Sequence, residues 1–291
     1  MIAKILSTLK ARGLAGVTNA VSRRLFHPRL ECARRVTRAV RGRSGLEIGG
    51  PTALFSRDGL LPVYAALGRL ANVNFSARTV WEGVVHEGPT FVYDSRRPPG
   101  MQYVMEASDL ARLADGDFEV LLSSHTLEHV ANPLETLREW MRVMSARGIL
   151  VMVLPHKEGT FDHRRPVTLL EHLVDDERRG TGEDDLTHLP EILALHDLTL
   201  DPQAGNPAAF AARSSRNLEN RCLHHHVFDT ELAIAMIDHA GLQILEAEAA
   251  LAHHIFMVAR KAAPGLRVDN SKFVGRDAAF RQTSPFAADR G

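Results

Sequence analysis

Residues 44–50 read SGLEIGG, a short apolar strand that ends in two glycines. Paired glycines leave no Cβ in the way, so a ligand can approach the backbone closely. Glu47, at the end of the strand, can accept a hydrogen bond from a cationic or hydroxyl group of that ligand. The turn lacks the glycine patterns of dinucleotide and triphosphate sites, which favours another nucleoside ligand. Taken alone, it fits a plain strand-to-loop turn equally well.

Downstream of this turn, strands and helices alternate. Further apolar strands are predicted at residues 118–123, 149–154, 242–247 and 254–259. Helices are predicted at residues 134–144 and 230–240, where Asn132 and Asp229 supply the caps. The alternation predicts an α/β fold with a Rossmann-like, doubly wound, mostly parallel sheet. In such sheets the ligand binds at the carboxyl ends of the strands.

The composition of the chain excludes several classes. Its 291 residues include 35 Lys plus Arg and 35 Asp plus Glu, a formal net charge of 0, which argues against a protein devoted to polyanions. Its two cysteines, Cys32 and Cys222, exclude a disulfide scaffold and a cysteine zinc cluster. No run of eighteen apolar residues occurs, so no membrane-spanning helix is expected. The unusual figure is 15 His.

Three parts of the chain differ in composition. Residues 1–43 are rich in Lys and Arg, with Glu31 as their only acid, and predict a basic amphipathic helical segment. This segment either caps the domain or lies on an anionic membrane surface as a peripheral contact. Residues 44–261 form the α/β domain. Residues 262–291, with few periodic apolar residues, predict a poorly ordered tail.

An insertion of about residues 156–226 follows the strand at 149–154 and is far longer than a strand-to-helix connection requires. Leucines at helical spacing predict two helices in it. Because it begins at the carboxyl edge of the sheet, we expect a lid over the acceptor; a surface subdomain held by His–carboxylate pairs is the alternative. Three of its residues could hold a carboxylate, phosphate or sugar acid: His163, Arg164 and Arg165.

A second motif, SSHTLEHVANP at residues 123–133, follows the strand at 118–123. An acidic segment, EASDL at residues 106–110, precedes that strand. With the LEIGG turn, these motifs in this order resemble the class I S-adenosylmethionine-dependent methyltransferases, in particular the type 11-like group. The resemblance covers about residues 44–261. It implies a methyltransferase that uses S-adenosyl-L-methionine on a Rossmann-like fold.

The resemblance also implies positions for the cofactor. The first turn would hold its methionine part, the acidic segment its adenine, and the end of the strand at 118–123 would face the sulfonium and the acceptor. The implied cofactor-binding residues are Glu47, Gly49, Gly50, Asn74, Ala107, Ser108, Asp109 and Ser124. At the ribose, the family has an acid where this chain has Asn74, and the Gly-Gly-Pro turn replaces spaced glycines.

Histidine is the natural general base if the acceptor is a hydroxyl. The candidate bases are His125, His156 and His225. His125, Glu128 and His129 also form an H-x-x-E-H motif, which on a helix would suggest a metal site. Because this segment is expected to be a strand-to-helix connection, no metal is predicted. Three adjacent histidines at 224–226 cannot all face one ion on an extended chain.

The sequence therefore predicts a cytoplasmic enzyme that methylates an oxygen or nitrogen of a small-molecule or glycan acceptor. Nucleic acid is not expected as a partner, because the basic surface is confined to residues 1–43. Two alternatives stay open. One is a non-catalytic cofactor-binding or scaffold protein of the same fold; the other is a membrane-surface enzyme acting on lipid-linked glycans.

Overall fold

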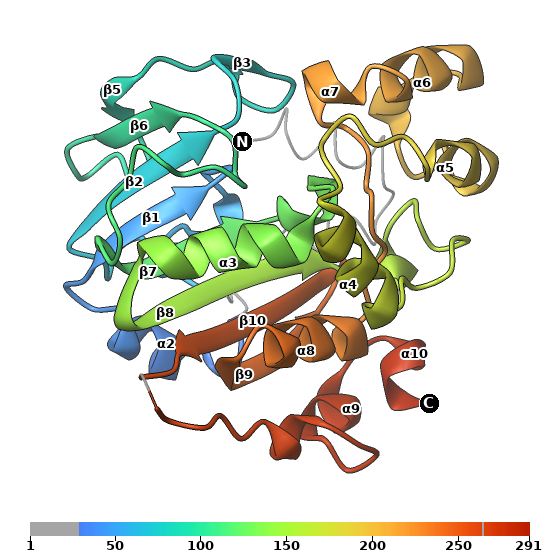
Figure 1. Ribbon diagram of the computed structural model, residues 1–291. Coiled ribbons are helices and arrows are strands. Elements are labelled where there is room, and N and C mark those ends of the chain that lie inside the picture. The colour runs from blue at the N-terminus through green and yellow to red at the C-terminus, as the bar shows by residue number, and fades with distance from the viewer. Residues whose placement is uncertain (1–28, 264) are drawn as a thin grey trace, which may run out of the picture.

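The computed structural model describes residues 29–263 and 265–291 (Figure 1). Its centre is an eight-stranded sheet. From edge to edge the strands are β5 (Gly88–Phe91), β6 (Gly100–Val104), β2 (Arg69–Asn74), β1 (Ser44–Ile48), β7 (Phe118–Ser124), β8 (Met144–Pro155), β10 (His254–Lys261) and β9 (Leu242–Ala250). A separate hairpin joins β3 (Arg78–Thr79) to β4 (Gly83–Val84).

The directions of the strands confirm the doubly wound sheet. Strands β6, β2, β1, β7 and β8 are mutually parallel, whereas β10 is antiparallel to both of its neighbours. From β1 the chain moves outward through β2 to β6, and then returns to β7 on the other side of β1. The topological switch point therefore lies between β1 and β7, where α/β sheets of this kind bind their ligands.

Helices cover both faces of the sheet. In Figure 1, α3 (Pro133–Val143), α4 (Leu170–Arg179) and α8 (Thr230–His239) lie in front of it and α2 (Ala33–Ala39) lies behind. Trp140 of α3 is fully buried in the front core, and its indole nitrogen donates to the carbonyl of Ala107 at 2.9 Å. This bond fixes the turn that follows β6 beside the switch point.

The elements predicted from the sequence are present, with bounds that differ by a few residues. The largest difference is in β8, which begins at Met144 instead of 149 because the Ala-Arg-Gly segment continues the strand, with Arg147 at φ 63. In the insertion, the two predicted helices are α4 and α5 (Leu189–Leu195). The sequence did not predict α6 (Pro207–Ser214) and α7 (Asn217–Asn220), which are short and carry few periodic apolar residues.

The basic N-terminal segment can be compared with its prediction only in part. Residues 1–28 of the basic segment lie outside the described residues. From residue 29 onward, the segment caps the back face of the sheet, where Leu30, Val36 and Val40 are buried. Among the described residues, no helix combines the length and the apolarity needed to cross a bilayer.

The prediction of a poorly ordered C-terminal tail is wrong for the described residues. The segment forms α9 (Ala279–Thr283) and α10 (Ala287–Arg290), and Phe280 and Phe286 are buried. The buried carboxylate of Asp289 accepts from Ser284 and from Thr230 of α8. Phe280, Phe286 and Asp289 each make their own contact with the domain. Because the buried residues of the tail are irregularly spaced, hydrophobic periodicity does not detect them.

Candidate functional site

A cavity of about 960 Å³ opens at the switch point between β1 and β7. Gly49 after β1 and Ser124 and His125 at the end of β7 form its floor, and Asn74 after β2 lines it from one side. The insertion forms another wall, through residues such as Phe161 and Arg221. Ligand cavities usually measure ~300–1,000 Å³, so this one is large enough for a nucleoside cofactor together with a small second substrate.

The turn after β1 requires glycine at residue 49. Gly49 has φ +79, and a Cβ there would lie 2.5 Å from the hydroxyl oxygen of Thr126. That hydroxyl donates to the carbonyl of Ile48 at 3.1 Å and so joins the turn after β7 to the turn after β1. Both the backbone conformation and the close contact therefore exclude a side chain at this position.

Glu47 supports this turn from inside the protein and does not reach the cavity. It is fully buried, and the hydroxyl of Tyr64 lies 2.8 and 2.9 Å from its two oxygens and donates to them. Gly50 also lies off the cavity, because a Cβ there would meet the Glu47 carboxyl carbon at 2.2 Å. Neither Glu47 nor Gly50 lines the cavity, and their side of the turn packs against the core, so their contact with the cofactor stays a prediction.

The buried carboxyl of Glu47 makes stability depend on pH. Burial raises its pKa from 4.5 to about 8, against the effect of the Tyr64 hydrogen bond. Between these values the folded protein holds a proton that the unfolded chain releases, so stability is full below the lower value and falls as pH rises. We expect a loss of up to ~1.4 kcal/mol per pH unit across this window. Urea unfolding across this pH range should show a flatter profile for Glu47→Gln; an equally steep one would contradict the assignment.

Asn74, the predicted ribose contact, lines the cavity. Its Oδ1 accepts from Asn72 Nδ2 at 2.7 Å and from Gln102 Nε2 at 3.1 Å, inside a buried amide network. Asn72 is fixed in turn by the backbone of Gly50, which donates to its Oδ1 and accepts from its Nδ2. The network therefore leaves Nδ2 of Asn74 to donate to a ligand in the cavity.

The turn after β6 reaches the cavity through Glu106 and Ala107. Ser108 and Asp109, the other predicted adenine contacts, do not line the cavity, and the exposed carboxylate of Asp109 accepts from the amide of Ala111 at 3.1 Å. Glu106, which the sequence argument passed over, pairs with Arg221 of the insertion at 2.6 Å. This pair closes the cavity between the sheet and the insertion.

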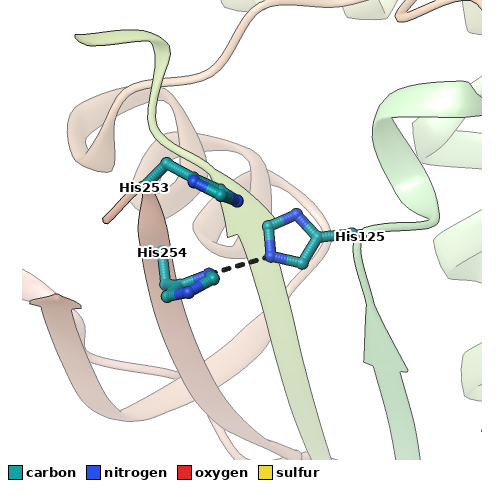
Figure 2. Close-up of side chains that lie close together, drawn as sticks. All are labelled: His125, His253 and His254. Atoms are coloured by element: carbon teal, nitrogen blue, oxygen red, sulfur yellow. Dashed lines mark hydrogen bonds between the residues drawn. The ribbon is translucent and has the colours of Figure 1, made fainter. Parts of the chain in front are cut away.

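Three histidines, which we call the imidazole cluster, meet beside the cavity: His125, His253 and His254 (Figure 2). His125 has φ 53, its Nε2 lies 2.9 Å from His254 Nδ1, and its Nδ1 lies 3.4 Å from a carboxylate oxygen of Glu128. Both of its nitrogens are thus engaged. His253 lines the cavity, and burial, followed by the neighbouring His125, lowers its pKa to about 4. Its ring is therefore neutral at physiological pH.

The other two candidate bases lie away from the cavity. His156 is fully buried, stacks on Phe286 at 3.9 Å, and bonds to Asp289 and to the amide of Glu158. His225 is buried, and its Nε2 bonds to Asn217 at 3.0 Å. Neither ring lines the cavity: the His156 ring contacts the tail, and the His225 ring bonds within the insertion, so the fold gives no support to their predicted role as bases.

The predicted acceptor-binding residues of the insertion lie away from the cavity. Arg165 is buried, and its guanidinium donates to Asp162, to Glu191 and to two backbone carbonyls. His163 and Arg164 both pair with Asp197, at 3.0 and 2.7 Å. The cationic groups of His163, Arg164 and Arg165 are thus already paired with carboxylates, and none of the three residues lines the cavity. These residues therefore cannot bind an anionic acceptor there.

Side chains that could hold a metal ion also gather in this half of the protein. Among the described residues, three groups each place one donor atom per residue within 4.8 Å of the others: His125, His253 and His254; His172, His188 and His226; Glu128, His129 and His224. Every member of the third group lines the cavity.

Comparison with known proteins finds a methyltransferase domain in the middle of the chain. A family model described as a methyltransferase domain matches residues 69–152, from β2 into β8. Matching solved structures include S-adenosylmethionine-dependent methyltransferases from Aquifex aeolicus (11% identity over 79% of this chain and 89% of that one, TM-score 0.37) and from Mesorhizobium loti (13%, 78% and 96%, 0.45). Curated protein sequences give no match. The match over residues 69–152, together with the strand order and directions, supports a class I methyltransferase domain that uses S-adenosylmethionine.

Proposed function

We propose that this enzyme methylates an oxygen or nitrogen atom of a small polar acceptor, such as a single sugar unit or another hydroxylated small molecule. The observation that carries the proposal is the cavity at the switch point, walled by the insertion and lined with imidazoles at the end of β7. At about 960 Å³ it has room for the cofactor and a small acceptor, but not for a folded macromolecule.

The residues along the cavity fit S-adenosylmethionine. We propose that the turn at Gly49 receives the methionine part, that Asn74 donates to the ribose, and that Glu106 and Ala107 border the adenine. Support comes from their order along the floor, at the carboxyl ends of β1, β2 and β6. Ser124 and His125, at the end of β7, then border the reactive end.

When bound, the cofactor supplies an electrophilic methyl group on its sulfonium. The chain must align the acceptor, exclude water and remove a proton from a hydroxyl acceptor. We assign the proton to a ring nitrogen of His253, because this ring lines the cavity and is neutral. His125, held between Glu128 and His254, positions the His253 ring at 5.2 Å between centroids. The insertion supplies one wall of the cavity.

The charges of the cavity disfavour a nucleic acid acceptor. Five carboxylates line it: Glu82, Glu106, Glu128, Glu183 and Asp201. The two arginines in the lining, Arg213 and Arg221, are already paired with Asp201 and Glu106. A polyphosphate chain would therefore meet net negative charge, whereas a neutral or cationic small molecule would not.

Cofactor affinity should distinguish Glu106 from Asp109. If Glu106 accepts a hydrogen bond from the adenine, Glu106→Gln should weaken binding of S-adenosylhomocysteine by ~1–3 kcal/mol, the effect of a lost buried hydrogen bond to a charged group. The matched control Asp109→Asn should bind normally, since that carboxylate faces solvent. Calorimetry on both variants measures this, and a loss confined to Asp109→Asn would restore the assignment made from sequence.

The acceptor can be found with cofactor labelled in its methyl group. Purified enzyme is incubated with a fractionated cell extract, and the labelled product is identified by mass spectrometry. A labelled small molecule carrying the methyl on oxygen or nitrogen supports the proposal. Label found only in nucleic acid or protein would contradict it.

A further inference from the structure

We propose that Glu128, His129 and His224 bind one divalent transition-metal ion, and that this ion holds the acceptor through two neighbouring oxygen atoms. The acceptor class is then a vicinal diol or a hydroxy acid. The choice of acceptor rests on the proposed function, whereas the metal site rests on geometry alone. We call these three residues the Glu128 triad.

Two backbone positions bring the triad together. The segment at His224 returns from the insertion and lies against the 3₁₀ turn Leu127–His129, where the amide of His225 donates to the carbonyl of Glu128 at 2.8 Å. One carboxylate oxygen and one nitrogen from each ring lie within 4.8 Å of one another. The donors thus converge from segments almost a hundred residues apart, and all three residues line the cavity.

Each histidine of the triad has an outer partner that orients its ring. Nδ1 of His129 donates to the carbonyl of Leu223 at 2.9 Å, and Nδ1 of His224 lies 2.5 Å from Asp162 Oδ2. Asp162 is itself held by the buried Arg165 at 3.1 Å. With Nδ1 taken, Nε2 is the nitrogen of each ring that can ligate. Carboxylate and carbonyl partners of this kind set the orientation and tautomer of metal-binding histidines.

The carboxylate of Glu128 is the unexplained group. Its side chain is 1% exposed, and Oε1 lies 3.4 Å from His125 Nδ1. The other oxygen, Oε2, is buried and has no hydrogen-bond partner among the described residues. An unpartnered carboxylate oxygen at this depth is costly. A cation between it and the two imidazoles would satisfy it.

The chemistry of the donors indicates the kind of ion. Two imidazoles and one carboxylate suit first-row transition metals such as zinc, cobalt, iron or manganese better than magnesium or calcium, which prefer oxygen donors. Three protein ligands leave coordination positions open, as in catalytic metal sites. Since the triad lines the cavity, an acceptor there can fill those positions with two adjacent oxygens.

The other two histidine groups are weaker candidates and serve as controls. In the imidazole cluster, nitrogens of His125 and His254 bond to each other at 2.9 Å. The group of His172, His188 and His226 does not line the cavity, and Asp176 accepts from His226 at 3.0 Å. An ion in that group would join α4 to the rest of the insertion and would not touch the acceptor.

The test uses the full chain without a histidine tag, stripped of metal by EDTA and then titrated with Co²⁺, Zn²⁺ and Mg²⁺. We expect one Co²⁺ per chain with visible d–d absorption, a matching Zn²⁺ site and no tight Mg²⁺ site. Glu128→Gln and His224→Ala should lose Co²⁺ affinity by more than ~100-fold, and Asp162→Asn by ~10–100-fold. The controls His188→Ala and His254→Ala should bind as the wild type does.

Circular dichroism of the metal-free variants shows whether each is folded. If His224→Ala does not fold, Glu128→Gln still tests the site, because it keeps the size of the side chain. Absence of a tight site in the wild type overturns the proposal, as does loss of the ion in His188→Ala with retention in Glu128→Gln. S-adenosylhomocysteine binding, measured in EDTA, tests the cofactor site separately. Full methyl transfer to an acceptor in EDTA would refute the metal role and leave the proposed function standing.

Discussion

Replacing His253 by alanine is expected to lower kcat for a hydroxyl acceptor by about 10²–10⁴-fold, the usual contribution of a general base. His253 lines the cavity, and its ring is neutral because burial lowers its pKa to about 4; the position of the ring, not this low pKa, assigns it the role of base. Cofactor affinity should be unchanged, because the predicted cofactor contacts lie on Gly49, Asn74 and Ala107. Steady-state kinetics with labelled cofactor measures the effect, once the acceptor is known.

The matched control is His239→Ala, an exposed histidine on α8, which should be fully active. His125→Ala should also lower kcat, because His125 positions the His253 ring, but by less than His253→Ala. An active His253→Ala together with an inactive His125→Ala would return the role of base to His125, as the sequence suggested.

Gly49→Ala should abolish measurable cofactor binding and destabilise the fold. The left-handed conformation costs a side chain ~1–3 kcal/mol, and the new Cβ would stand 2.5 Å from the hydroxyl of Thr126. The turns after β1 and β7 must then separate, which displaces the backbone that receives the methionine part. Calorimetry with S-adenosylhomocysteine and thermal melting measure the two effects.

Gly241→Ala is the control that separates the steric clash of the new Cβ at residue 49 from the cost of a left-handed backbone conformation. Gly241 has a similar φ of +74, but a Cβ there meets nothing within 4 Å. This control should be mildly destabilised and bind the cofactor normally. Normal binding by a folded Gly49→Ala would mean that the turn after β1 does not receive the cofactor.

The sequence predicted five of the eight strands, namely β1, β7, β8, β9 and β10, because each of them leaves a local apolar pattern. In β8, for example, residues 149–154 are a continuous apolar run, and the glycine turn must follow β1 for steric reasons that Gly49 shows. In the acidic segment before β7, Glu106 and Ala107 line the cavity, whereas the predicted Ser108 and Asp109 do not. Hydrophobic periodicity does not fix the register of a loop, so it could not tell that Glu106 turns inward and Asp109 outward.

The errors in the insertion have a different cause. Its arginines and histidines were assigned to an acceptor because they are charged. In the fold, however, Arg165 forms ion pairs with Asp162 and Glu191 inside the protein. Composition shows that cations are present but not which carboxylates face them. His253 and His224 come from segments distant in sequence from the motif at 123–133, so only the folded chain brings them to it.

The H-x-x-E-H motif shows the same limit. The spacing suggested His125 and His129 as a ligand pair, and the absence of a helix there argued against any ion. In the fold, His125 turns toward His254, and Glu128 and His129 instead meet His224 from the insertion. The residues needed for a metal site were thus present, but the third partner could not be found from spacing.

A crystal structure of the enzyme with S-adenosylhomocysteine tests the central claim most directly, which is that the cofactor lies in the cavity at the switch point between β1 and β7. We predict the homocysteine part against the turn at Gly49, the ribose within hydrogen-bonding distance of Asn74 Nδ2, and the adenine beside Glu106 and Ala107. The sulfur should face the imidazole cluster. A ligand bound elsewhere, or one in the cavity with its sulfur turned away from His253, would contradict this account.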